Sequence, residues 1–555
     1  MTLPGLFSET VRNFGQRPAL ALVGKPPITY KELEGFIASV IGHLESLGIS
    51  HGDKVAILAS SSPNWAISYY AITFMGAVAV PILPDFHESE VENIILHSES
   101  RAIFYSAGLK SKLSPLLDKI LTNRIVVDDL LENEVINTST YSSGQGLLKS
   151  YDVKEDDLAA IIYTSGTTGK SKGVMLTHKN ICFTALKGSK IIPIYETDRF
   201  LSVLPLSHSY ENTIGLVLPM INGACVYYLG GLPTPAILLP ALQLVKPTFM
   251  LTVPMIIEKI YRNKIKPAFT EKRIVRMLYS IPPVRKVLNR AAGKKLLETF
   301  GGELRFYGIG GAKLSSTIEK FLIEARFPYA IGYGLTETSP LLAGCSPSNT
   351  RLQSTGPALE EVELKIHNPD PITGEGEIWA KGANVMLGYY KEPEMTAEII
   401  TPDGWLKTGD LGIFDKDGYL FIQGRKKNTI LGSGGENIYP EEIESVINNF
   451  KHVLESLVIE QKGKLVALVH FNSAEIEEKY LHMKHEVTSY VEHKIDELKI
   501  ELKEYINSRV NKFSKVQSVE NQTEPFQKTP TQKIKRFLYN SAKNVNNPES
   551  GSGHL

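Results

Sequence analysis

The chain has 555 residues, of which 43% are apolar and 22% are charged, and its 60 Lys and Arg residues balance 60 Asp and Glu residues. This length exceeds what a single hydrophobic core supports, so we expect two or more domains. A net charge of zero argues against a nucleic-acid partner that is recruited by bulk charge.

Neither the cysteines nor the apolar stretches point to secretion or to a membrane span. The three cysteines lie far apart and form no CxxC pair, which favours free thiols in a reducing cytoplasm. Residues 1–9 lack the pattern of a signal peptide. The most apolar stretches, 67–84 and 214–229, are interrupted by Gly and Pro and fall short of about 20 uninterrupted apolar residues. We expect a cytoplasmic protein, in which any membrane contact is peripheral.

The first half of the chain alternates predicted helices with predicted buried strands. Thr29 and Glu32 form a capping box, which begins a helix that ends at Gly48. A second helix is predicted over 65–75, and strands are predicted over 54–59, 77–82, 101–106, 224–229 and 248–253. This alternation is typical of a layered α/β architecture with largely parallel sheets.

Near residue 355 the predicted strands become short and rich in turns. They cover 361–366, 376–380 and 418–422, and Asp-Gly pairs mark the turns between them. Beyond Arg425 the sequence predicts a smaller α+β unit, with a helix over 440–448 and a hairpin of strands 456–460 and 464–471.

Residues 475–515 differ from the rest of this unit. Apolar residues recur there at steps of three and four with charges between them, as in an amphipathic helix. We expect an insertion that packs on the small domain; a dimer coiled coil or a membrane-surface helix are the alternatives. The last residues, 546–555, are predicted to be disordered.

The most informative segment is residues 163–178, whose first seven residues are all Ser, Thr, Gly or Tyr and which continues through two lysines. An apolar run of strand length precedes the segment and another apolar run follows it. Bare backbone amides, hydroxyls and two ammonium groups in such a loop suit a polyphosphate, although a solvated linker has a similar composition. A Walker A loop is not matched, because its first glycine would have to stand at Thr164.

Five later segments carry related chemistry. Residues 307–313 are rich in glycine but lack the last glycine of a dinucleotide fingerprint. Tyr333 could stack on a purine, and the nearby Thr336 and Glu337 could hold Mg²⁺ against phosphate oxygens. A carboxylate at Asp410 suits two ribose hydroxyls, and residues 424–430 form a cationic cluster. Residues 528–535 place a lysine near the end of the chain.

In this order and over residues 5–540, the segments resemble the adenylate-forming superfamily of acyl-CoA synthetases, luciferases and peptide-synthetase adenylation domains. The resemblance implies a large N-terminal domain (1–424) of layered α/β subdomains with a β-barrel part. A small, mobile α+β C-terminal domain (425–545) would follow it. Within the superfamily, residues 204–213, 354–357 and 385–391 look most like those of long-chain fatty-acid–CoA ligases.

The same resemblance implies roles for individual residues. ATP and Mg²⁺ would be bound as cofactors and coenzyme A would be the co-substrate, with Glu337 and Thr164 at the metal. The nucleotide would be bound by Thr164, Ser165, Gly166, Thr167, Thr168, Gly169, Lys172, Gly310, Gly311, Ala312, Tyr333, Gly334, Thr336, Asp410 and Arg425.

Three further residues would act in the reaction. His208 resembles the gate residue beside the acyl carboxylate, although a satisfied loop histidine is the plainer alternative. Lys427 matches the hinge position, and Lys533 matches the lysine that enters the site for adenylation. The family usually has Gly before that lysine, where this chain has Gln532, which restricts the backbone.

Small-molecule substrates are therefore expected, namely a fatty acid, ATP and coenzyme A, with no nucleic acid and with a monomer or a homodimer as the assembly. An acyl–acyl-carrier-protein synthetase and a ligase for another carboxylic acid stay open. Thr164 speaks against a P-loop kinase, and the intact catalytic set speaks against a non-catalytic binding module. Since Gly308 and Gly310 carry no side chains, they are expected to leave room for an acyl tunnel, and bulky side chains in that space would favour short or aromatic acids.

Overall fold

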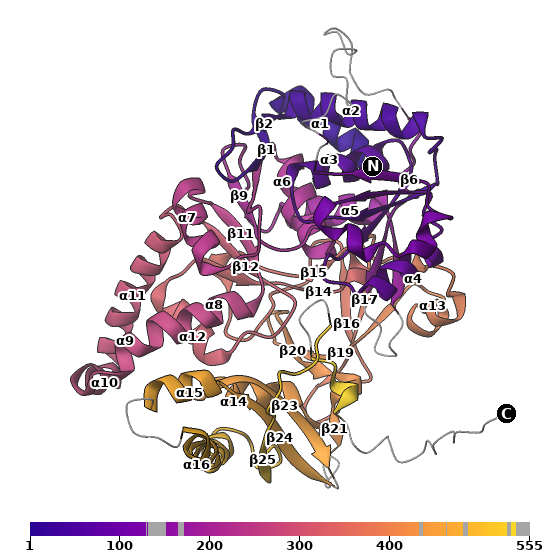
Figure 1. The fold of residues 1–555 in the computed structure, drawn as a ribbon. Helices are drawn as coiled ribbons and strands as arrows, with labels where there is room; N and C mark the ends of the chain where they lie inside the picture. Colours follow the sequence, from indigo (N-terminus) through magenta and orange to yellow (C-terminus); the bar gives the residue numbers. More distant parts are fainter. Residues whose placement is uncertain are drawn as a thin grey trace, which may run out of the picture. The chain divides into compact units, whose positions relative to one another are not determined.

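The computed structural model describes residues 1–128, 130, 151–164, 171–431, 437–461, 463–480, 487–529 and 534–539 (Figure 1). The chain divides into two units. The first consists of Met1–Gly374, Ile378–Thr408 and Ile413–Phe421, and the second of Glu375–Glu377, Gly409–Gly412 and the residues from Ile422 onward. The predicted tail 546–555, Lys533 and loop residues 165–170 lie outside the described ranges.

Two seven-stranded sheets form the frame of the first unit. One has the order β13 (Tyr329–Ile331), β12 (Phe306–Ile309), β11 (Phe249–Thr252), β9 (Arg199–Ser202), β10 (Cys225–Tyr228), β1 (Pro18–Leu22) and β2 (Ile28–Thr29). The other has the order β18 (Gly388–Tyr389), β8 (Lys172–Thr177), β7 (Leu158–Thr164), β4 (Val78–Ile82), β3 (Lys54–Leu58), β5 (Ala102–Tyr105) and β6 (Asn123–Val126). Most neighbouring strands are parallel, as predicted, and β2, β8 and β18 are the antiparallel additions.

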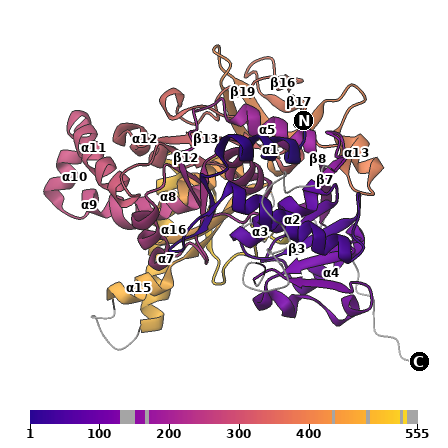
Figure 2. The same ribbon diagram turned by 90° about the horizontal axis from the view of Figure 1, so that it is seen from above.

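Helix α3 (Pro63–Phe74) is packed between these two sheets. Its residues from Trp65 to Phe74 are all buried, as expected of a helix that is apolar on every side. Trp65 shares one core cluster with Ile57 of the second sheet and Val226 of the first. The unit is therefore layered, and its outer helices lie at opposite ends: α8 (Pro254–Ile260), α11 (Pro282–Thr299) and α12 (Ser316–Ala325) at one, and α4 (Glu88–Ser98) at the other (Figures 1 and 2).

Local signals explain where the first helices begin. Helix α2 (Tyr30–Ser46) has the predicted capping box, in which the Thr29 side chain accepts from Glu32 N and the Glu32 carboxylate accepts from Thr29 N. Gly48 follows it with a φ of 76°. Helix α3 begins two residues before its predicted start, because Ser62 caps it and Pro63 occupies its first turn.

The short strands beyond residue 355 form a four-stranded sheet in the order β16 (Glu363–His367), β17 (Gly376–Lys381), β19 (Leu406–Phe414) and β20 (Leu420–Arg425). This sheet stands where a β-barrel part was predicted. Strand β16 begins two residues later than predicted, because Glu361 has a φ of 64°, which an extended strand does not allow.

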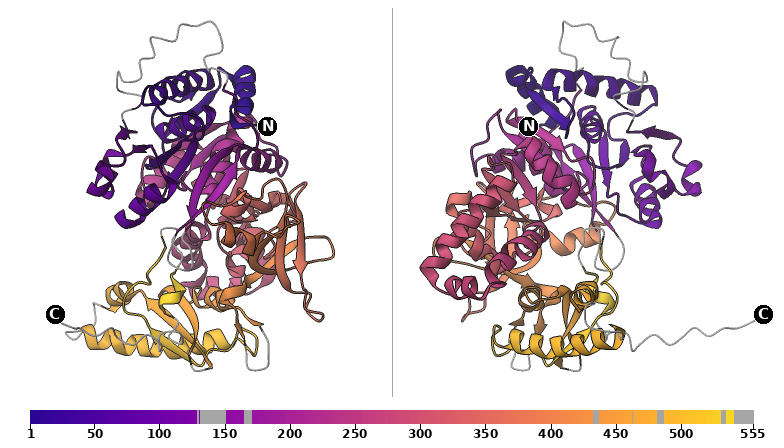
Figure 3. Two further views of the ribbon diagram at one scale, coloured as in Figure 1. Left: turned by 90° about the vertical axis from the view of Figure 1, so that its right-hand side faces the viewer. Right: turned by 60° about the vertical axis from the view of Figure 1, so that its left-hand side comes forward.

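The second unit is built on a three-stranded sheet of β23 (Val453–Gln461), β24 (Lys464–Phe471) and β25 (Ser518–Asn521). Helices α14 (Pro440–Ile447), α15 (Ser473–Tyr480) and α16 (Val487–Asn507) pack on it. Both views of Figure 3 show the long helix α16 lying along this sheet. Its Leu498 and Leu502 are fully buried in one cluster with Ile447. This apolar face is thus used inside the unit, which disfavours a coiled coil or a membrane-surface helix.

Candidate active site

The two ends of the predicted phosphate loop meet in the first unit. Strands β7 and β8 are antiparallel, and Thr164 at the end of β7 pairs with Lys172 at the start of β8. The intervening candidates, Ser165–Gly169, lie outside the described residues. A side chain at Gly173 would come within 2.8 Å of Ile161 Cγ2, so this position beside the loop requires glycine.

Tyr389 joins two of the predicted site residues that are far apart in the sequence. Its hydroxyl donates a hydrogen bond of 2.8 Å to Glu337 Oε1. The ammonium group of Lys172 lies 5.0 Å from the centre of its ring, within the range of a cation–π interaction. A cation and a carboxylate therefore both contact one phenol. The three residues, Lys172, Tyr389 and Glu337, are named the loop-end cluster below.

Strand β18 places Tyr389 there. Tyr389 pairs with Val174 of β8, and Met386 N donates to the carbonyl oxygen of Glu337 at 2.9 Å. The sequence pattern around 385–391 pointed to this segment but assigned no role to Tyr389. In the sequence, the available signal was a tyrosine that directly follows a glycine. The structure shows this glycine, Gly388, with a φ of 149°.

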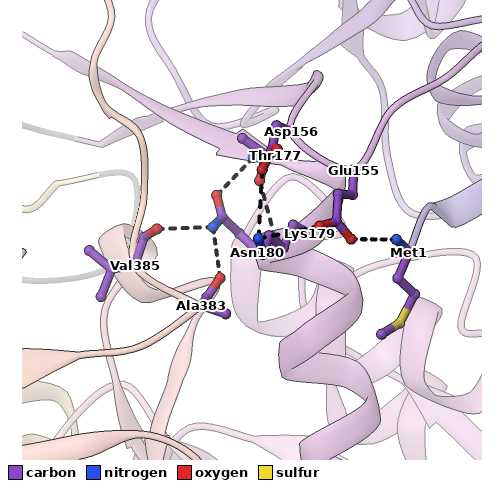
Figure 4. A network of polar contacts seen from close by, with 8 residues as sticks. All are labelled: Met1, Glu155, Asp156, Thr177, Lys179, Asn180, Ala383 and Val385. Atoms are coloured by element: carbon purple, nitrogen blue, oxygen red, sulfur yellow. Dashed lines mark hydrogen bonds and ion pairs between the residues drawn. The ribbon is translucent and has the colours of Figure 1, made fainter.

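Asn180 anchors the segment that leads into β18 (Figure 4). Its side-chain amide donates to the carbonyl oxygens of Ala383 at 2.8 Å and Val385 at 2.9 Å. Its side-chain oxygen accepts from Thr177 N at 2.9 Å, which caps helix α5 (His178–Gly188). One buried side chain thus ties the start of a helix to the loop that carries Tyr389.

The predicted metal residue Glu337 lies in a short 3₁₀ turn, Thr336–Thr338, after strand β14 (Tyr333–Gly334). Thr336 Oγ1 accepts from Ser209 Oγ at 3.4 Å, which connects this turn to the segment that contains His208. Position 334 requires glycine, because a Cβ there would come 1.8 Å from the carbonyl oxygen of Pro340. Tyr333 and His208 are both partly buried.

Tyr210 lies against Gly308 in β12 and Gly310 directly after it, where the sequence predicted room for an acyl tunnel. A Cβ at Gly310 would lie 3.2 Å from ring atoms of Tyr210, and one at Gly308 would lie 3.1 Å from its hydroxyl. Tyr210 therefore occupies the room expected for an acyl tunnel. Gly311 has a φ of 83°, which favours glycine, and Ala312 is exposed.

A π-helix, Tyr210–Val217, carries Tyr210 and a buried acid that the sequence did not single out. π-Helical turns often occur at functional sites. Glu211 is 1% exposed, and burial raises its pKa to about 8. A Cβ at Gly215 would come 2.7 Å from the Glu211 carboxyl carbon, so the glycine makes room for the acid.

In the second unit, the predicted ribose residues form an ion pair. Arg425 Nε lies 2.8 Å from Asp410 Oδ1, and the Asp410 side chain is largely buried. They stand on the neighbouring strands β19 and β20. Lys427, the predicted hinge residue, is exposed in the 3₁₀ turn Lys426–Asn428.

The donors near the phosphate loop fit Mg²⁺ and a nucleotide. Glu337 and Thr164 offer hard oxygen atoms, which this ion prefers. In the part of the chain that the structure describes, no three His, Cys, Asp or Glu side chains form a ready-made metal site.

Comparison with known proteins decides the family. The sequence profile of the AMP-binding enzyme family matches residues 7–390, which include the phosphate loop and the whole loop-end cluster. The chain belongs to the AMP-binding enzymes. Membership confirms the resemblance inferred from the motifs.

Two curated relatives from Arabidopsis thaliana illustrate the family's range. A peroxisomal long chain acyl-CoA synthetase 6 is 31% identical over 76% of this chain and 65% of its own length. This chain thus spans slightly less than two thirds of that relative. A chloroplastic long-chain-fatty-acid–[acyl-carrier-protein] ligase, AEE15, is 29% identical over 86% of this chain and 77% of its own.

The fold class is confirmed by a solved structure. The o-succinylbenzoate coenzyme A synthetase of Bacillus subtilis, in complex with ATP and a magnesium ion, matches with a TM-score of 0.75. It is 24% identical and covers 96% of this chain and 98% of its own.

The buried Glu211 predicts how stability depends on pH. Its carboxyl is protonated in the folded protein below about pH 8, whereas it ionises near 4.5 when unfolded. Between these two pH values the folded state binds one proton more than the unfolded state. The stabilisation that this proton gives to the folded state is therefore complete below about pH 4.5 and is lost as the pH rises to 8. Glu211→Gln cannot ionise. Relative to this variant, the free energy of unfolding of the wild type should fall by about 3 kcal/mol between pH 5.5 and 8.

Urea unfolding at several pH values measures this difference. The exposed Glu9→Gln serves as the control and should follow the wild type. Parallel pH profiles of the wild type and Glu211→Gln would show that Glu211 does not carry the proton.

Proposed function

We propose that the protein joins a long-chain fatty acid to coenzyme A, using ATP and releasing AMP and pyrophosphate. The observation that carries the proposal is the loop-end cluster, in which Tyr389 holds the carboxylate of Glu337 next to Lys172 and the end of the phosphate loop. Family membership and the activities for which the two Arabidopsis relatives are named support it.

The first reaction needs positioning more than proton transfer. An oxygen of the fatty carboxylate attacks the α-phosphorus of ATP, and the bond to pyrophosphate breaks, which leaves an acyl-adenylate. Negative charge accumulates on the phosphoryl oxygens. Lys172 lies where it would neutralise part of this charge, and Glu337 with Thr164 would hold Mg²⁺. Losing one such preorganised group typically costs about 10²–10³ in rate.

Further contacts follow from the resemblance. Thr164–Lys172 would wrap the triphosphate, Gly310, Gly311 and Ala312 with Tyr333 would line the adenine, and Thr336 would touch the α-phosphate. Asp410, paired with Arg425, would take the ribose hydroxyls. His208 would stand beside the acyl carboxylate. These assignments stay predictions, as does a cytoplasmic location.

The second reaction replaces phosphate chemistry with sulfur chemistry. The thiol of coenzyme A attacks the acyl carbon, loses its proton to solvent and expels AMP. By resemblance, Lys533 would assist adenylation and then leave, as the C-terminal domain turns about Lys427 to admit the thiol. A carrier-protein thiol is the second candidate acceptor, which the AEE15 relative favours.

Product analysis tests the proposal. Incubation with ATP, Mg²⁺, palmitate and coenzyme A should yield AMP, pyrophosphate and palmitoyl-CoA in equal amounts. Formation of ADP would overturn acyl-adenylate chemistry. Replacing coenzyme A by a holo-carrier protein distinguishes the two acceptors. Turnover with the carrier protein but not with coenzyme A would favour the carrier protein as the acceptor.

Tyr210 predicts how the acyl chain length is selected. Its ring fills the space over Gly308 and Gly310, which by the criterion of the sequence analysis favours short or aromatic acids, so a long chain can enter this space only by displacing the ring. Tyr210→Ala should therefore raise kcat/KM for palmitate relative to octanoate by about tenfold, in line with the 1–3 kcal/mol of one methylene contact in an apolar pocket. Pyrophosphate exchange across acids of graded length measures this ratio.

Tyr210→Phe keeps the ring and is the matched control. It should retain the wild-type ratio. An unchanged ratio in Tyr210→Ala would remove Tyr210 from the acyl site.

A further inference from the structure

Helix α10 (Arg273–Tyr279) exposes several apolar side chains. None of its seven residues is fully buried. Ile274 is 71% exposed, Met277 64% and Leu278 40%. A surface helix of a soluble protein normally turns such side chains inward.

The apolar surface continues past the end of the helix. Ile281 is 42% exposed in the connection to α11, and Val287 on α11 is 64% exposed. Exposed apolar side chains that gather in one segment are a feature of sites of protein or membrane contact. No helix in the described part of the chain is long and apolar enough to cross a bilayer, so a membrane contact here would be peripheral.

The helix is held firmly to the first unit on its other side. The Tyr279 ring stacks on Phe269 at 4.6 Å, and its hydroxyl donates to Asn289 Oδ1 at 2.9 Å. Asn289 in turn donates to Glu324, which also pairs with Arg285 at 2.8 Å. Exposure of the apolar side chains is therefore a property of the fold.

The same segment is strongly basic. Residues 272–297, named the basic–apolar arm, contain no Asp or Glu, although the whole chain carries 60 acidic and 60 basic residues. The basic side chains are Lys272, Arg273, Arg276, Arg285, Lys286, Arg290, Lys294 and Lys295. Among the described residues, no ion pair is recorded for Arg273, Arg276 or Arg290, and all three are exposed.

In both Figures 1 and 2, α10 lies at the outer end of the helices that cover the first sheet. A flat partner can reach it there. Arginines and lysines attract anionic headgroups, and aliphatic side chains beside them can enter the headgroup region.

We propose that the basic–apolar arm docks this protein on an anionic phospholipid bilayer. Ile274, Met277 and Leu278 enter the interface, and Arg273, Arg276 and Arg290 contact lipid phosphates. A second copy of the chain fits poorly, because two arms would place eight basic residues against eight. Nucleic acid would use the charges but leave the apolar side chains without a contact. The inference concerns a surface and does not depend on the proposed reaction.

Vesicle co-sedimentation of the full chain, without substrates, tests the docking. The wild type should bind vesicles of phosphatidylcholine and phosphatidylglycerol at 7:3, bind pure phosphatidylcholine much more weakly, and be released by about 0.5 M salt. Arg273→Gln/Arg276→Gln should weaken binding by at least about tenfold, since each basic residue near an anionic surface contributes about fivefold. The exposed pair Arg12→Gln/Lys25→Gln removes the same charge elsewhere and should bind as the wild type does.

The apolar half of the proposal has its own variant. Ile274→Ser/Met277→Ser should lose most of the vesicle binding, whereas the control Ile372→Ser/Leu116→Ser, at sites 92% and 50% exposed, should keep it. Octanoate-dependent pyrophosphate exchange should be unchanged in all four variants, which shows that they fold.

Equal binding of arm and control variants would overturn the proposal. So would an arm variant that loses binding to a DNA duplex while keeping vesicle binding. Vesicle binding by a protein without ligase activity would leave the docking intact and overturn only the proposed reaction.

Discussion

The hydrogen bond from the Tyr389 hydroxyl to Glu337 is the contact on which the site depends. It joins the 3₁₀ turn that follows one seven-stranded sheet to strand β18 of the other. The same ring faces the ammonium group of Lys172, where the phosphate loop returns to β8. The carboxylate that we propose for the metal and the cation that we propose for the phosphates are thus both positioned by one side chain. Such preorganisation is what charge stabilisation in a transition state requires.

The packing around Tyr389 explains why this contact can be precise. Asn180 ties the preceding loop to the start of α5 through two hydrogen bonds, and Met386 N bonds the backbone of Glu337. A buried amide that lost these partners would leave polar groups unsatisfied at a cost of about 1–3 kcal/mol. Glu211 is buried and Tyr210 partly buried on the neighbouring π-helix. The groups that we propose to act on the phosphates therefore rest on ordered elements, and the proposed selection of the acid depends on the Tyr210 ring.

Local signals in the sequence were sufficient for much of the fold. The capping box at Thr29, the buried strands and the layered α/β class follow from spacing and residue type. Motifs also singled out Glu337, Asp410 and Arg425, whose roles stay predictions, and the structure places the last two in an ion pair. Tyr389 and Tyr210 could not be assigned in this way, because their contacts, with Glu337 and with Gly308 and Gly310, join segments more than 50 residues apart. Glu211 could not be assigned because its burial follows from packing that the sequence does not display. The start of β16 was misplaced for a similar reason, since the positive φ of Glu361 leaves no mark in the sequence.

The Mg²⁺ dependence of acyl-adenylate formation in Tyr389→Phe tests the central claim most directly. This variant keeps the ring above Lys172 and removes only the hydroxyl that holds Glu337. Mutation of a residue that hydrogen-bonds a metal ligand typically lowers metal affinity or activity by 10–100-fold. The Mg²⁺ concentration for half-maximal pyrophosphate exchange should therefore rise by about tenfold, while Tyr390→Phe, whose hydroxyl bonds Glu99, should match the wild type. An unchanged Mg²⁺ midpoint in Tyr389→Phe would contradict the account.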